Sequence, residues 1–297
     1  LCYNANTYVN TSELQGKLKE TTQLGCELIN DNSVEADAEM IALVVESLKA
    51  SGLKEFLVEI GHVDFYNGLI AESGLDEEAE VELREMILNK NDFAVEEILN
   101  QNNVTGEVKN AMLKLPELFG SVDILNTAKE LTTNNKALHA IKRLEKLYSI
   151  LEDYGVSKYI SFDLASLSNY GYYTGIIFKG FTYGTGEPIA AGGRYDKLLS
   201  QFGKNAAAIG FAIYMDQIMI AQSGHIQKND YEYEVVVYEP KYRKYAFSLA
   251  CDLRNSGIKT ELIPKKKDID IDEYKKFKME DGASKVTYVS KDGAVEI

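Results

Sequence analysis

The first pattern with chemical meaning is an alternation of polar and apolar side chains between residues 21 and 29. Gln23, Gly25 and Glu27 share one face of the predicted strand, because successive side chains along a strand point to opposite faces. A carboxylate and an amide that point the same way beside a glycine suggest the floor of a pocket. The same alternation is equally typical of a strand whose polar side faces solvent, so the residues alone leave both interpretations open.

A second group of chemically versatile residues lies between residues 162 and 217, around which we expect the chain to be organised. It contains Tyr172-Tyr173-Thr174-Gly175, Ala191-Gly192-Gly193-Arg194-Tyr195-Asp196 and Ile209-Gly210-Phe211-Ala212. The paired glycines allow a backbone or a ligand to approach closely, since no Cβ intervenes. In an alternating strand, one side chain of the Arg194-Tyr195 pair can point into a pocket while its neighbour points into the core.

The composition is that of a soluble globular protein, with 297 residues, 45% apolar and 26% charged. Lys and Arg number 32 against 46 Asp and Glu, for a net charge of −14, which disfavours tRNA or another nucleic acid as partner. Cys2, Cys26 and Cys251 show neither a disulfide framework nor metal-ligand spacing. We therefore expect reduced thiols in a cytoplasmic protein without metal or membrane span. Because the chain begins without Met, we also expect a natural N-terminal portion to precede it.

The elements that must position these residues fall into two predicted domains, residues 1–222 and 230–297. In the larger one, strands are expected at 1–8, 21–29, 55–60 and 158–163, and a helix at 37–52. A helical insertion is expected at about 66–154, with short acidic helices at 77–89, 93–100 and 106–115 and an amphipathic helix at 137–154. The smaller domain alternates strands and helices, which favours an α/β domain with a parallel or mixed sheet.

Taken together, these motifs resemble the histidine-binding motifs and the third class II motif of histidyl-tRNA synthetases. The block from residue 162 to 217 is still more similar to one offshoot of that family, the regulatory subunits of ATP phosphoribosyltransferase. The resemblance implies an α+β fold: a class II synthetase-like mixed or antiparallel sheet surrounded by helices, with a helical insertion. It also implies that the small C-terminal α/β domain corresponds to a shortened anticodon-binding domain.

Within this resemblance, the cations that the synthetases use for adenylation are missing. The arginine that holds the ATP α-phosphate falls on Val9, a second arginine falls on Ser168, and the Glu-Arg that ends the third motif is Asp216-Gln217 here. Because adenylation builds negative charge on a phosphate, losing one such donor costs roughly 10²–10³ in rate. The resemblance therefore implies no catalytic residues, no bound cofactor and no metal.

The positions that would hold an amino acid are better retained. Gln23 and Glu27 match residues that contact the histidine ligand in the synthetases, where a carboxylate suits the ammonium group. Tyr173 and Tyr195 match tyrosines that border the imidazole, and we expect the adjacent Arg194 to orient the site. The alternative is that the chain no longer binds histidine, and that these residues are kept only because they pack in the fold.

What the resemblance implies is a non-catalytic regulatory subunit of ATP phosphoribosyltransferase. It would form a homodimer inside a hetero-oligomer, be required for the activity of a separate catalytic subunit, and allow feedback inhibition by histidine in histidine biosynthesis. A histidyl-tRNA synthetase is the first alternative, and the lost arginines and the net charge of −14 argue against it. A free-standing histidine sensor without a phosphoribosyltransferase partner is the second.

Overall fold

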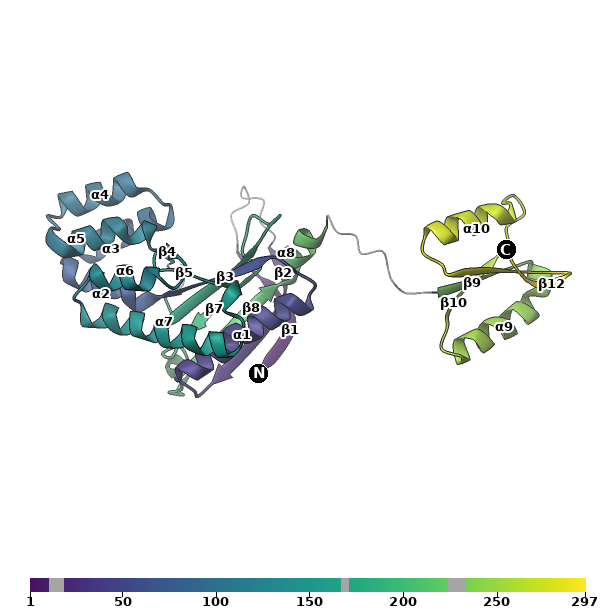
Figure 1. Cartoon of the computed structure of the whole chain (residues 1–297), viewed down its shortest axis with the longest axis horizontal. Coiled ribbons are helices and arrows are strands. Elements are labelled where there is room, and N and C mark those ends of the chain that lie inside the picture. The colour runs from purple at the N-terminus through teal and green to yellow at the C-terminus, as the bar shows by residue number, and fades with distance from the viewer. Residues whose placement is uncertain (11–18, 167–170, 224–232) are drawn as a thin grey trace. The chain divides into compact units, whose positions relative to one another are not determined.

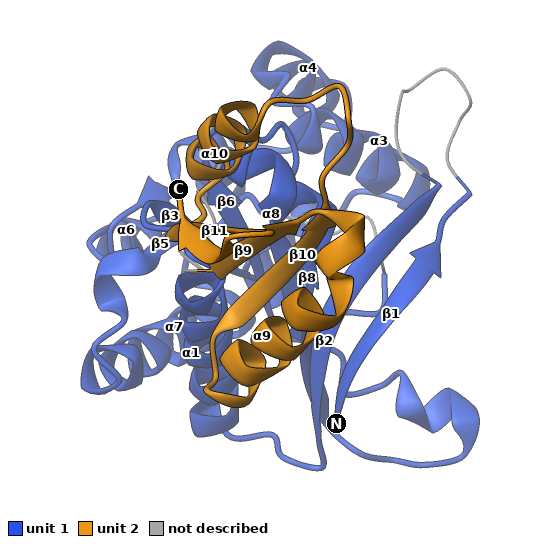
Figure 2. Ribbon diagram, turned by 90° about the vertical axis from the view of Figure 1, so that its right-hand side faces the viewer, with its two compact units in different colours: residues 1–224 blue, residues 225–297 orange. Residues whose placement is uncertain are grey.

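A computed structural model of the chain describes residues 1–10, 19–166, 171–223 and 233–297. They form two compact units, residues 1–224 and 225–297, shown in blue and orange in Figure 2. Each unit buries a hydrophobic core of its own, so the units are considered separately. Within the described ranges, none of the helices is both long and apolar enough to cross a membrane.

The larger unit is built on a mixed sheet, which is eight-stranded in the described part of the chain. Its strands are β1 (Cys2–Tyr8), β2 (Glu20–Ile29), β3 (Phe56–His62), β4 (Phe119–Gly120), β5 (Ile160–Asp163), β6 (Ile176–Thr182), β7 (Ala190–Arg194) and β8 (Ala208–Tyr214). They lie in the order β1-β2-β8-β7-β6-β3-β5-β4. Only the pair β3 and β5 is parallel among these neighbours, so the sheet is mostly antiparallel.

Helices cover one face of this sheet and extend beyond one of its edges. They are α1 (Val34–Ala50), α2 (Val63–Ser73), α3 (Glu77–Leu88), α4 (Asp92–Gln101), α5 (Gly106–Lys114), α6 (Ile124–Glu130), α7 (Asn135–Asp153) and α8 (Met215–Gln222). Figure 1 shows α1 and α7 lying side by side, with α3, α4 and α5 grouped at the end of the unit away from β1. Helix α1 begins at a side-chain cap, because Ser33 Oγ accepts a hydrogen bond of 3.1 Å from the Ala36 amide.

The segment predicted as a helical insertion shares the core of the larger unit. A continuous hydrophobic cluster runs from Ile41 of α1 through Leu144 of α7 to Leu83 of α3 and Leu99 of α4. Helix α7 also contacts α1 through polar groups, since Arg143 Nε donates to a carboxylate oxygen of Asp37 at 2.8 Å. The last helix of the predicted insertion therefore belongs to the layer that covers the sheet.

The smaller unit is a separate α/β fold with a four-stranded mixed sheet in its described residues. Its elements are β9 (Tyr233–Tyr238), α9 (Arg243–Asn255), β10 (Lys259–Pro264), α10 (Ile271–Glu280), β11 (Lys285–Ser290) and β12 (Gly293–Glu296). Strand β9 pairs in parallel with β10 and β11, and β12 adds antiparallel to β11. Val235 and Val237 pack into one cluster and Val236 into another, which explains the unbroken apolar run of a strand buried on both faces.

Candidate functional site

The face of the larger sheet opposite α1 is lined by small residues around Glu27. In the pairing of β2 with β8, Glu27 lies opposite Gly210 and Gly25 lies opposite Ala212. On the next strand, Gly193 lies opposite Gly210. Since alternate residues of a strand share a face, these positions form one floor, while the intervening residues pack into the core under α1.

The glycines on this floor, which have no side chains, make room for the groups that could bind a ligand. A Cβ added at Gly210 would overlap the Glu27 carboxylate, and one added at Gly25 would overlap the Tyr3 ring. A Cβ at Gly193 would come within 2.7 Å of the Tyr173 ring and of a backbone oxygen. The glycines of the predicted motifs are thus required by side chains that lie directly over them.

Glu27 is half-buried in this floor and is held by Tyr195, whose hydroxyl donates a hydrogen bond to Glu27 Oε2. Burial raises the pKa of Glu27, and the hydrogen bond from Tyr195 opposes that rise. Burial also raises the pKa of Tyr195, with the neighbouring carboxylate adding to the effect. At pH values above this raised pKa, Glu27 is ionised, and its carboxylate has lone pairs left to accept hydrogen bonds from a cationic ligand.

Tyrosine rings stand around this carboxylate. The centroids of Tyr172 and Tyr173 are 4.5 Å apart, and Tyr172 meets Tyr195 edge-on at 6.0 Å. Burial is the largest cause of the raised pKa of Tyr173, and Glu27 is one of its neighbouring charges. Glu27, Tyr173 and Tyr195 are therefore brought together, and Tyr172 and Tyr3 join them. Sequence reasoning missed both additional tyrosines, although Tyr172 precedes Tyr173 and Tyr3 alternates with polar residues of its own strand.

Gln23 lies on the same face of β2 as Glu27, four residues earlier, opposite Tyr214 of β8. Its side chain is partly exposed. In the described part of the chain it has no hydrogen-bond partner, so its amide is available to a ligand.

Arg194 is the one predicted site residue that the structure places elsewhere. Its guanidinium is 2% exposed and binds Asp37 of α1, with Nε donating to Oδ1 at 2.8 Å and Nη2 at 2.6 Å from the same oxygen. Nη1 donates to the Asp31 carbonyl and to Asp196, and Nη2 also reaches the Ser33 carbonyl. Every N–H of the guanidinium is engaged within the protein, so Arg194 has no donor left for a ligand and can only position the site.

The positions at which the resemblance to the synthetases implies an arginine carry no cation here. Val9 follows β1, is 42% exposed, and contributes only its backbone amide, which donates to the Lys19 carbonyl at 2.9 Å. Gln217 lies in α8, one residue after Asp216, whose carboxylate accepts from the Thr22 amide at 3.0 Å. The third position, Ser168, lies outside the described residues.

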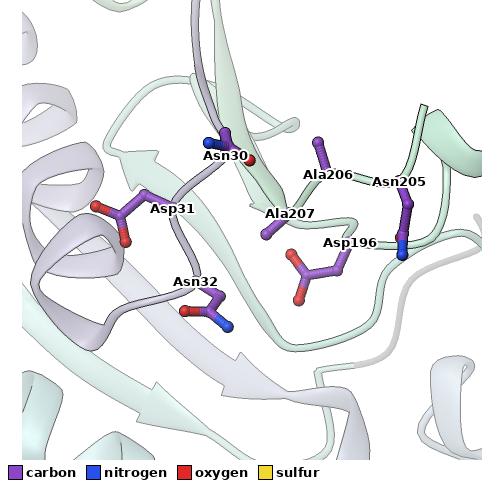
Figure 3. Close-up of a pocket in the computed structure, with 7 residues that line it drawn as sticks. All are labelled: Asn30, Asp31, Asn32, Asp196, Asn205, Ala206 and Ala207. Atoms are coloured by element: carbon purple, nitrogen blue, oxygen red, sulfur yellow. The ribbon is translucent and has the colours of Figure 1, made fainter.

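Two open pockets lie apart from this floor. The one in Figure 3 has a volume of about 430 Å³ and lies where β2 ends, next to Asp196. It is lined by Asn30, Asp31, Asn32, Asp196, Asn205, Ala206 and Ala207. A second, of about 610 Å³, lies around Lys54 and Tyr159. Neither is lined by Glu27 or Tyr195.

Comparisons with known proteins place this arrangement among synthetase-like folds. A family model described as Histidyl-tRNA synthetase matches residues 1–218. A solved structure described as an ATP phosphoribosyltransferase regulatory subunit/histidyl-tRNA synthetase from Bacillus halodurans is 33% identical, with a TM-score of 0.82, and the match covers 97% of this chain and 72% of that one. The predicted class II synthetase-like fold is confirmed by these matches.

Two curated relatives carry the same description. The ATP phosphoribosyltransferase regulatory subunit of Acetivibrio thermocellus is 38% identical over 88% of this chain and 63% of the relative. The protein of the same description from Thermoanaerobacter pseudethanolicus is 40% identical over 92% of this chain and 72% of the relative. The chain thus spans somewhat less than two thirds of the Acetivibrio protein.

Proposed function

This chain belongs to the family of ATP phosphoribosyltransferase regulatory subunits, as its motifs predicted, and on that premise we propose that it regulates a separate catalytic subunit without catalysis of its own. The catalytic subunit would make phosphoribosyl-ATP from ATP and phosphoribosyl pyrophosphate in the cytoplasm. A homodimer of this chain inside a hetero-oligomer would make that subunit active and sensitive to histidine. The observation that carries the proposal is the half-buried Glu27 carboxylate, held by Tyr195 on the floor, while Val9 and Gln217 provide no cation for a phosphate.

The proposed histidine contacts follow from the chemistry of the floor. The Glu27 carboxylate would accept hydrogen bonds from the α-ammonium, and the Gln23 amide would contribute a neutral contact on the same face. Tyr173 and Tyr195 would border the imidazole, with ring movement making room for it. Arg194 would act indirectly, because it ties β7 to α1 through Asp37.

The assembly is tested by mixing the purified chain with the catalytic subunit of the same organism. We expect a stable complex by size-exclusion chromatography, and phosphoribosyl-ATP formation that requires both proteins and falls when histidine is added. A catalytic subunit that is fully active alone would overturn the regulatory role. Binding of histidine by this chain without any complex would instead favour the free-standing sensor.

The first prediction is that the chain does not activate histidine. Histidine-dependent exchange of pyrophosphate into ATP should stay at background, because Val9 and Gln217 provide no cation for the phosphate. A histidyl-tRNA synthetase measured in parallel provides the positive control. Exchange above background by the purified chain would favour the synthetase alternative.

The second prediction concerns Gly210→Ala. The new methyl group would displace the Glu27 carboxylate from Tyr195, and we expect histidine binding to weaken by about 1.5–3 kcal/mol, the usual contribution of a charged hydrogen bond. The free energy of unfolding should fall by no more than the contribution of the Tyr195–Glu27 hydrogen bond, about 1.5–3 kcal/mol, because only the end of a flexible side chain is displaced and the backbone stays in place. Gly186→Ala is the matched control, since its Cβ would have no neighbour within 4 Å. Calorimetry measures histidine binding, and chemical denaturation measures the free energy of unfolding. If Gly210→Ala binds histidine with unchanged affinity, histidine does not bind at Glu27.

A further inference from the structure

Two cysteines face each other across neighbouring strands at the edge of the larger sheet, on the face opposite the floor. Cys2 of β1 pairs with Cys26 of β2 in the strand register, and the Cys2 thiol donates to Cys26 Sγ at 3.4 Å. The adjacent pair, Leu1 and Glu27, exchanges both backbone hydrogen bonds, with N–O distances of 2.7 and 2.8 Å. Hydrogen-bonded and non-hydrogen-bonded pairs alternate along an antiparallel ladder, so Cys2 and Cys26 form a non-hydrogen-bonded pair.

This kind of pair suits a disulfide. Its Cα atoms are about 4.5 Å apart, which lies within the range of roughly 4.4–6.8 Å found across disulfides. The two sulfurs can therefore bond after side-chain rotation, without moving the backbone. We propose that Cys2 and Cys26 are a redox-active thiol pair that a low-molecular-weight disulfide oxidises reversibly to a cross-strand disulfide, which fixes β1 against β2.

The reaction proceeds by two thiol–disulfide exchanges. The exposed Cys2, as thiolate, attacks one sulfur of oxidised glutathione, and one glutathione leaves as a thiol. The Cys26 thiolate then attacks the Cys2 sulfur of this mixed disulfide, and the second glutathione leaves. In sum, the two protein thiols give up two electrons and two protons, and the oxidant becomes two thiols. Burial is the main cause that raises the pKa of Cys26, to about 11, so this second exchange should accelerate as the pH rises.

Oxidation would also act on the neighbouring floor. Tyr3 follows Cys2 and covers Gly25, the residue before Cys26, so a disulfide would hold together the two strand segments that carry the Tyr3 ring and Gly25. This consequence rests on the proposed histidine site, where a ligand beside Glu27 shares space with the tyrosines. Oxidised protein should then bind histidine about fivefold more weakly or worse, the lower end of usual coupling between sites.

The test oxidises the whole chain with glutathione disulfide and measures intact mass. We expect a loss of about 2 Da from the loss of two thiol hydrogens, a peptide joining Cys2 to Cys26, and full reversal by dithiothreitol. Cys251→Ser, which removes the exposed thiol of the smaller unit, should behave as wild type. Cys26→Ser should stop at glutathione attached to Cys2. Wild type that stops at the same mixed disulfide, or that bonds Cys251 instead, would overturn the proposal.

Calorimetry with histidine on the reduced and oxidised forms tests the consequence. Weaker binding in the oxidised form supports it, and equal affinity overturns the coupling while the disulfide itself stands. Failure of both forms to bind histidine would instead overturn the proposed histidine site, so the two failures are distinguishable.

Discussion

Asp37→Asn is expected to lower the free energy of unfolding of the larger unit by about 3–5 kcal/mol, the usual effect of breaking a buried ion pair. Asp37 is fully buried, and its two carboxylate oxygens accept hydrogen bonds from Arg194 and Arg143, each at 2.8 Å. Asparagine keeps the shape but removes the charge. Arg194, which is 2% exposed, would then retain a buried charge without its main partner.

Chemical denaturation followed by circular dichroism measures this effect, with the transition of the smaller unit as an internal reference. Glu35→Gln is the matched control on the same helix, because its ion pair with Lys146 is exposed on both sides and should contribute little. Adding Arg194→Met to Asp37→Asn should recover part of the loss, since the unpaired charge is then removed as well. If Asp37→Asn is as stable as the wild type, the ion pairs of Asp37 with Arg194 and Arg143 do not hold β7 to α1.

Glu27→Gln is expected to weaken histidine binding by about 1.5–3 kcal/mol, because the ammonium would lose a charged acceptor. That corresponds to roughly a 10- to 150-fold higher dissociation constant. Glutamine keeps the length of the side chain, and its carbonyl oxygen can still accept from the Tyr195 hydroxyl. Feedback inhibition of the complex should need correspondingly more histidine, while basal activation by this chain should persist.

Calorimetry on the isolated chain and inhibition curves on the complex test the two parts. Glu20→Gln is the control from the same strand, since Glu20 is exposed and bonds Tyr8 and Asn6 outside the floor. If histidine affinity and histidine inhibition are both unchanged in Glu27→Gln, the residues around Glu27 serve only to pack the fold. Histidine would then act elsewhere in the assembly.

Local patterns predicted most elements closely, because alternation and helical spacing depend on neighbouring residues. The strands Glu20–Ile29 and Ile160–Asp163 lie within two residues of the predicted ranges 21–29 and 158–163, and so do the three acidic helices of the insertion. The short elements β4 and β12 and the helix α6 were missed. Each is too short for a periodic pattern to be recognised reliably along the sequence, and the two strands are defined by pairing with a neighbour.

The candidate site was predictable in part. Gln23 and Glu27 share a face because a strand has a period of two, and this holds wherever the strand lies. The partner of Arg194 was not predictable in the same way, because the sequence shows that Arg194 and Tyr195 point to opposite faces but not which face is covered. Helix α1 packs on one face and brings Asp37 to the arginine, so Tyr195 remains for the floor.

By itself, the sequence therefore determined the family and the fold class, because these depend on residue types in order along the chain. The tertiary structure decided which residues meet. Cys2 and Cys26 show no informative spacing in the sequence, yet a hairpin register places their sulfurs 3.4 Å apart. Arg194 and Asp37, which are 157 positions apart, form a buried ion pair because α1 packs on the face of the sheet to which Arg194 points. Side-chain contacts between distant segments depend on strand order and register, which no local pattern encodes.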